Sequence, residues 1–116
     1  MVHLTLEVIE ELAERIRPIG PWLPTVLELS LVGFQTSATA TAAEVIQFLS
    51  KDPAPREVLA YRASGRSQAR LQRLLALNET GLLGGDEQRE LDEMQRIEHI
   101  LIMLKARIAE QAPQEP

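Results

Sequence analysis

Apolar and polar residues alternate over the first six positions of the chain, and the spacing then becomes helical. One side of an extended segment would carry Val2, Leu4 and Leu6, and the other side would carry His3 and Thr5. From residue 8 onward the apolar residues recur every three or four positions, which is the helical period. The pattern predicts a strand over residues 2–6 and a helix over 7–17. Because a lone strand leaves its backbone hydrogen bonds unmade, we expect it to pair with a second copy of itself.

Prolines and glycines in "RPIGPWLP" predict that the first helix stops there. The following helix, within residues 23–34, is apolar nearly all round, which predicts burial against a partner chain. Residues 35–43 are rich in Thr, Ala and Ser and predict a linker or a lightly helical bridge. The residues expected in the core of a dimer are Val2, Leu4, Leu6, Leu27 and Leu31.

The second half of the chain reads as helical throughout. Short helices are expected within residues 42–50 and 56–61, and Ser64 is placed to cap a longer helix that Gly81 ends. The short link "GLLGG" predicts that the last helix, about 86–111, folds back antiparallel to it. The predicted organisation is a dimerisation region (1–34), a linker (35–43), a helical partner-binding region (44–111) and a disordered tail (112–116).

Composition narrows the class of protein. With 116 residues, 45% of them hydrophobic and only 3% aromatic, the chain is long enough for one domain with an aliphatic, helix-packed core. The net charge of −5 argues against broad, sequence-independent nucleic-acid binding. No cysteine is present and no apolar run approaches the roughly 18 residues of a membrane span. A cytoplasmic protein without a membrane partner is expected.

Catalytic motifs are not found. Glu98 and His99 are adjacent on a helix and therefore point about 100° apart, too far to share one substrate or metal. There is no Ser/His/Asp order, phosphate-binding glycine loop or HExxH spacing. We therefore predict no enzyme activity, no cofactor, no metal and no small-molecule substrate.

An arginine face is the more informative cluster. Arg66, Arg70 and Arg73 follow four-then-three spacing on one helix face, and Arg62 lies just before them. Two alternatives stay open: these arginines pair with the acidic run "DEQRELDE" of the last helix, or they bind an acidic partner or a phosphate backbone.

The opening "VHLTLEVIEELAERI" resembles that of ribbon-helix-helix antitoxins. In that family two strands pair across a two-fold axis and enter the DNA major groove. The resemblance implies that His3 and Thr5 contact bases and that the start of the second helix, at Thr25, contacts phosphate. Against this, the outward strand face has no Arg, Lys, Asn or Gln, and Pro24 removes a backbone N–H.

A second resemblance covers residues 42–64 and 68–108. It is most specific in "LLALNETG" and "EHILIMLKARI", and it is to small, mostly uncharacterised bacterial helical proteins of cyanobacterial type. These proteins look like antitoxins that neutralise a PIN-domain nuclease, so the resemblance implies a cognate toxin as partner.

Together these features predict a mainly α protein: a ribbon-helix-helix-like homodimer followed by a C-terminal helical hairpin. The expected function is that of a type II antitoxin, with operator DNA as a further candidate partner. An arginine such as Arg62 or Arg66 would enter the acidic nuclease site. The alternative is a non-enzymatic interaction or scaffold module, or a small subunit of a larger assembly, without DNA binding. The expected partner-binding residues are Arg62, Arg66, Arg70, Arg73, Leu101 and Leu104.

Overall fold

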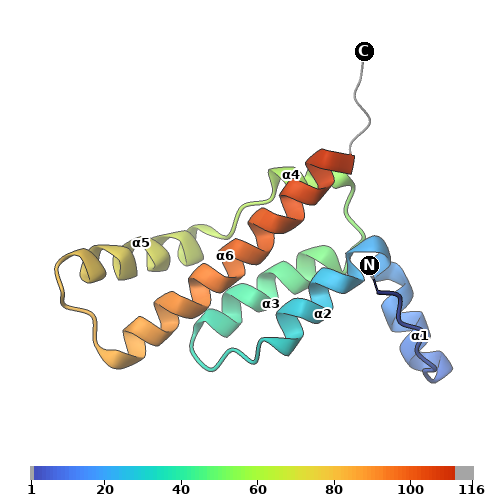
Figure 1. Cartoon of the computed structure of the whole chain (residues 1–116), viewed down its shortest axis with the longest axis horizontal. Helices are drawn as coiled ribbons and strands as arrows, with labels where there is room; N and C mark the ends of the chain where they lie inside the picture. The colour runs from blue at the N-terminus through green and yellow to red at the C-terminus, as the bar shows by residue number, and fades with distance from the viewer. Residues whose placement is uncertain (1, 112–116) are drawn as a thin grey trace, which may run out of the picture.

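The computed structural model describes residues 2–111, and every regular element within that range is a helix. Figure 1 shows α6 running diagonally through the molecule, with α5 on one side of it and α2 and α3 on the other. The short helix α1 projects from one end. In chain order the elements are α1 (Glu10–Ile16), the 3-10 segment η1 (Arg17–Trp22), α2 (Leu23–Leu31), α3 (Ala38–Leu49), α4 (Pro55–Ala60), α5 (Gly65–Glu79) and α6 (Gly85–Gln111).

The predicted N-terminal strand is absent. Residues 2–9, called the N-terminal arm below, carry no regular secondary structure, and the described chain contains no strand with which they could pair. The expected ribbon-helix-helix fold is therefore wrong, whereas the mainly helical character is confirmed. Alternation of side chains shows only which residues would share a face; a strand also needs a neighbour for its backbone hydrogen bonds.

Two other boundaries differ from the prediction. The first helix begins at Glu10 rather than at residue 7, with Glu10 and Glu11 in the turn where acidic side chains suit the helix dipole. The segment 35–43 was expected to be a linker or a lightly helical bridge, but α3 already begins at Ala38. Its small residues Ala38 and Ala42 are buried, which lets the helix backbone approach its neighbours closely.

The predicted stop between the first two helices is confirmed. Pro18 and Pro21 lie within η1, and Gly20 between them adopts φ 62° and ψ −134°, a conformation that side-chain-bearing residues avoid. A Cβ atom added to Gly20 would lie 2.9 Å from Oδ1 of Asp52. This kink sets the direction in which α1 leaves the rest of the protein.

The C-terminal hairpin is also confirmed. Ser64 Oγ accepts a hydrogen bond from the backbone N–H of Ser67 at 3.2 Å and so caps α5. At the other end Gly81 has φ 73°, and the N–H of Leu82 donates to the carbonyl of Leu77 at 3.0 Å. The expected disordered tail, residues 112–116, lies outside the described residues.

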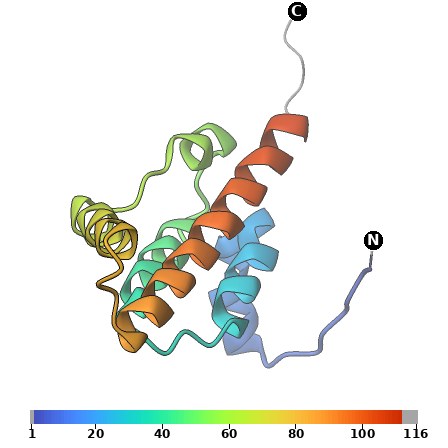
Figure 2. The same ribbon diagram turned by 60° about the vertical axis from the view of Figure 1, so that its left-hand side comes forward.

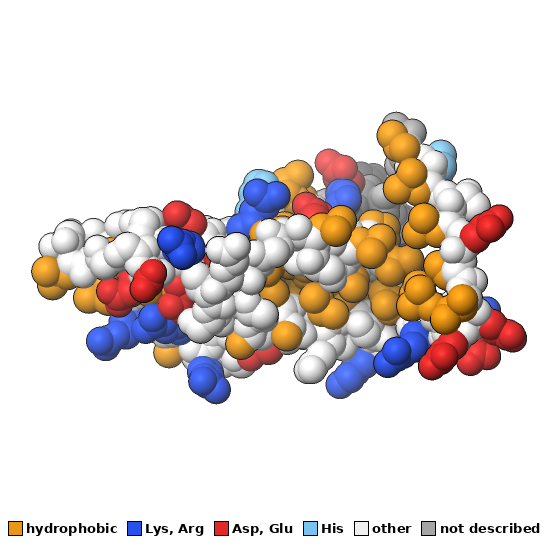
Figure 3. All heavy atoms as spheres, turned by 90° about the horizontal axis from the view of Figure 1, so that it is seen from below, with side chains coloured by type: hydrophobic (Ala, Val, Ile, Leu, Met, Phe, Trp, Pro, Cys, Tyr) orange, Lys and Arg blue, Asp and Glu red, His pale blue; other side chains and the backbone are white. Residues whose placement is uncertain are grey.

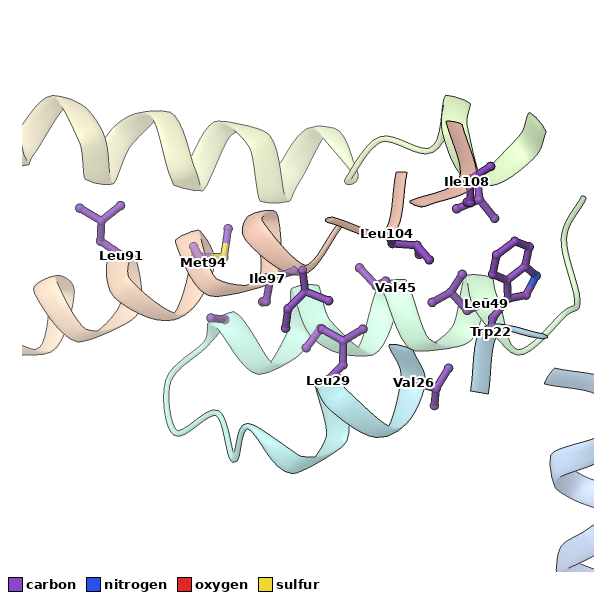
Figure 4. Close-up of a cluster of buried hydrophobic side chains, with 14 of the residues drawn as sticks. Trp22, Val26, Leu29, Val45, Leu49, Leu91, Met94, Ile97, Leu104 and Ile108 are labelled. Carbon is purple, nitrogen blue, oxygen red and sulfur yellow. The ribbon is translucent and has the colours of Figure 1, made fainter. Parts of the chain in front are cut away.

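A single cluster of buried side chains joins the two halves of the chain (Figure 4). Val45 and Leu49 of α3 are fully buried, and they face the inner stripe of α6. The members of that stripe recur every three or four residues, which is the helical spacing. Its buried members are Leu91, Met94, Ile97, Ile100, Leu104 and Ile108.

Replacing Leu49 tests this core. The Leu49→Ala variant should lower the free energy of unfolding by about 2–5 kcal/mol, because it removes a fully buried side chain and leaves a cavity. The control Leu82→Ala alters a leucine that is 69% exposed and should change it by less than about 0.5 kcal/mol. Urea unfolding measures both, and equal effects would contradict the described core.

Candidate partner-binding grooves

An ion pair joins α5 to α6. Nε of Arg70 donates to Oε2 of Glu90 at 2.7 Å, and Nη2 donates to Oε1 at 2.8 Å, which is a bidentate arrangement. Glu90 is only 6% exposed. These hydrogen bonds outweigh the opposing effect of burial and hold the pKa of Glu90 below its ordinary value. Of the two alternatives for the arginine face, pairing with the last helix is thus found at Arg70.

Glu93, one turn further along α6, holds the loop before α3. Its carboxylate accepts from the backbone N–H groups of Gln35 and Thr36 at 2.9 and 3.0 Å, and from the Thr36 hydroxyl at 2.6 Å. Burial by itself would raise the pKa of Glu93, but the hydrogen bonds from Thr36 and Gln35 together lower it. The acidic run of α6 is therefore not simply a solvated face.

A groove of about 380 Å³ lies between α5, α6 and residues 61–63, and we call it the hairpin groove. Its wall includes the half-buried Leu101 and the exposed Ile102 of α6. Three charged side chains, Arg62, Glu98 and Lys105, also contribute to its lining. The groove therefore combines an apolar wall with charges of both signs.

Residues 61–63, which form one side of the hairpin groove, are held in place by Lys105. Nζ of Lys105 donates to the backbone carbonyl of Tyr61 at 2.7 Å, and the Tyr61 ring packs on Phe48 with centroids 4.5 Å apart. Burial, reinforced by the charge of Glu44, raises the pKa of Tyr61. The phenol therefore stays neutral at neutral pH, which suits packing and hydrogen bonding rather than nucleophilic chemistry.

A second groove, of about 670 Å³, lies between the start of α2, α4 and the end of α6. Trp22 and Ile108 form part of its apolar wall, and Trp22 is fixed because Nε1 donates to the carbonyl of Pro53 at 2.9 Å. Among residues 2–111 the charged residues of the lining are Arg56 and Arg107, both exposed, and no carboxylate of that range lines the groove. We call it the arginine groove.

The predicted partner-binding residues fall in different places. Arg62 lines the hairpin groove and is exposed, whereas Arg66 and Arg73 are exposed on α5 outside the groove lining. Leu101 also lines the hairpin groove, and its contact with a partner stays a prediction. Leu104 is only 5% exposed and belongs mainly to the core.

The residues predicted for the core of a dimer are exposed in the single chain. α2 is consequently not buried all round as its composition suggested, because its outer face is open while Leu29 on the inner face is 2% exposed. Dimerisation stays a prediction. The exposed fractions are 84% for Val2, 84% for Leu4, 72% for Leu6, 45% for Leu27 and 82% for Leu31.

The residues expected to contact DNA are not brought together as a reading surface. His3 and Thr5 are exposed, but they lie on the irregular N-terminal arm rather than on a strand. Thr25 is only 3% exposed in the first turn of α2, so its side chain is not available to a phosphate. Proteins that contact bases in a DNA groove usually do so with a strand or a helix, and the N-terminal arm forms neither.

Within residues 2–111 there is no group of three or more His, Cys, Asp or Glu side chains that could hold a metal ion. His99 is exposed on α6. None of the helices in the described part of the chain has the length and apolar character that a membrane span requires.

Comparison of the chain with protein-family models, with curated proteins and with solved structures finds no match. The resemblance to antitoxins therefore remains an expectation from the sequence motifs.

Sequence reasoning missed the structural part that Glu93 plays and the existence of both grooves. A glutamate within an acidic run of a helix is usually solvated, and nothing local distinguishes one that reaches a distant loop. The grooves arise from the positions of neighbouring helices, which no single segment encodes. The sequence held one indication of the arginine groove: its single tryptophan, Trp22, lies in a proline-rich segment between two helices.

The hydrogen bonds accepted by the carboxylates of Glu90 and Glu93 predict that the stability of the protein depends on pH. Because the pKa values of Glu90 and Glu93 are lowered in the folded protein, their stabilisation is complete above the ordinary value of 4.5 and is lost as the pH falls below it. Urea unfolding between pH 7 and pH 3 measures this loss. The Glu90→Gln variant should lose about 1–3 kcal/mol at pH 7 and show a flatter pH profile. The exposed control Glu79→Gln should keep the wild-type profile; a wild-type profile in Glu90→Gln would contradict the assignment.

Proposed function

We propose that the protein is a non-enzymatic helical interaction module that binds a segment of another protein in the hairpin groove. The observation that supports this most directly is Ile102, an aliphatic side chain that is 56% exposed at the wall of the groove. The neighbouring Met103 is 48% exposed on the same helix. Exposed apolar side chains beside a groove are typical of a surface that another chain covers.

The lining favours a peptide or helix over a small molecule. Small-molecule sites are usually enclosed and hold a few converging polar groups. In the hairpin groove an apolar wall runs along α6. Two basic side chains, Arg62 and Lys105, and one acidic side chain, Glu98, also line the groove. An amphipathic helix could place its apolar face on this wall and pair its charged flanks with the edge.

The second candidate is the antitoxin function that the sequence motifs imply. It is favoured by Arg62, which is exposed at the hairpin groove and makes no ion pair within residues 2–111. A free guanidinium beside the groove could enter a cluster of carboxylates such as a nuclease site and displace its metal ion. In this case the toxin would be the partner that the module binds.

Binding to the protein encoded beside this gene tests the proposal. Ile102→Asp should weaken binding by roughly tenfold or more, because it places a charge in an apolar contact. The antitoxin function adds that Arg62→Ala releases the nuclease activity of that protein. The control Leu82→Asp changes a leucine on the α5–α6 loop that is 69% exposed and lies outside the groove lining, and it should bind like the wild type. If titration calorimetry gave Ile102→Asp the same dissociation constant as the wild type, the hairpin groove would be excluded as the contact surface.

The module function predicts no preference for the promoter of its own gene. Fluorescence polarisation should give equal, weak affinities for promoter and scrambled duplexes, because the N-terminal arm forms no rigid reading element and the net charge is −5. A preference for the promoter that falls steeply with salt would contradict the module function and support operator binding.

A further inference from the structure

The N-terminal arm is rich in aliphatic side chains, and no residue of the arm or of the largely charged helix α1 is buried. Ile9 is 71% and Leu12 is 42% exposed, and α1 has no buried residue. Figure 2 shows the arm extending away from the helical body, and Figure 3 shows hydrophobic side chains gathered along it. A helix of seven residues is too short to be stable in water by itself. The arm and α1 therefore need a surface that their own chain does not give them.

The kink at Gly20 keeps α1 away from its own core. Gly20 has a positive φ and lies against Asp52, whereas Trp22, two residues later, is already part of the buried cluster. Only η1 therefore separates the projecting helix from the fixed body. The arm and α1 of one molecule are directed outward, where a second molecule can receive them.

The arginine groove has the complementary chemistry. Its wall is apolar, and its charged residues, Arg56 and Arg107, are both basic. The ion pair recorded within the described range is that of Arg70 and Glu90, so neither groove arginine is paired with a carboxylate there. Besides three prolines, the apolar members of the lining are Trp22, Leu59, Leu104 and Ile108.

Residues 2–14 match this groove in both respects. Aliphatic side chains alternate along the arm, and the arm and α1 together carry four glutamates against one arginine, Arg15, so the segment is net acidic. An extended apolar arm could therefore lie along the groove wall while the following acidic turn reaches the arginines. These glutamates are Glu7, Glu10, Glu11 and Glu14.

We infer that the N-terminal arm and α1 of one copy of this chain occupy the arginine groove of a second copy. The exchange is reciprocal, so each dimer contains the same contact twice and closes on itself. Two such contacts help to reach the roughly 1,600 Å² of a standard-size interface. The contact is made by side chains in a groove and requires no strand. It lies apart from the hairpin groove and is independent of the proposed function.

Complementation between two variants tests this arrangement. The arm variant, Leu4→Asp with Leu6→Asp, damages the arm and keeps the groove; the groove variant, Arg56→Glu with Arg107→Glu, does the reverse. Light scattering after size exclusion should give a dimer for the wild type and a monomer for each variant. Mixing the two should restore a heterodimer with one intact contact. The substituted side chains are exposed, so circular dichroism should show unchanged helix content.

A charge reversal makes the test more specific. Adding Glu10→Arg and Glu11→Arg to the groove variant restores opposite charges on arm and groove within one chain, and the dimer should return. The control Leu31→Asp alters the outer face of α2 and should leave the dimer intact.

Four outcomes would overturn the inference. They are a monomeric wild type, variants that remain dimeric, a mixture of variants that stays monomeric, and a dimer that Leu31→Asp alone dissociates. If the chain's own residues 112–116 filled the groove, the arm variant would keep the mass of the wild type.

Discussion

The apolar stripe of α6 is the constraint on which the other elements depend. α2, α3, α4 and α5 all pack against this one helix of 27 residues, which is about 40 Å long. The stripe also positions both grooves. Residues from Met94 to Lys105 line the hairpin groove, and residues from Leu104 to Gln111 line the arginine groove. One continuous helix therefore places the two grooves in a fixed relation.

Polar contacts define how the surrounding helices sit on that stripe. In the first half of α6, Glu90 reaches α5 and Glu93 reaches the loop before α3. Lys105, further along, holds the chain after α4 at its backbone. Apolar packing alone would allow helices to slide, whereas these hydrogen bonds have fixed partners. One of them borders the hairpin groove directly, because both Lys105 and Tyr61 belong to its lining.

Local signals in the sequence predicted the elements that depend on local chemistry. Ser64 and Gly81 marked the ends of α5 correctly, since capping is a property of a few adjacent residues. The strand over residues 2–6 was wrong because pairing depends on a distant partner. Of the residues predicted to bind a partner, Arg62 and Leu101 line the hairpin groove, and the mostly buried Leu104 lines the arginine groove. Their role in binding stays a prediction, and the sequence could not show their burial because the spacing of a helix face does not reveal which neighbour covers it.

The position of Trp22 has a practical consequence. It is the chain's single tryptophan, it is 6% exposed, and its indole forms part of the wall of the arginine groove. Indole emission depends on the polarity of its surroundings, so any occupant that excludes water from that wall changes the intrinsic fluorescence. The native protein therefore carries its own optical reporter at this surface, and occupancy can be followed without attaching a label.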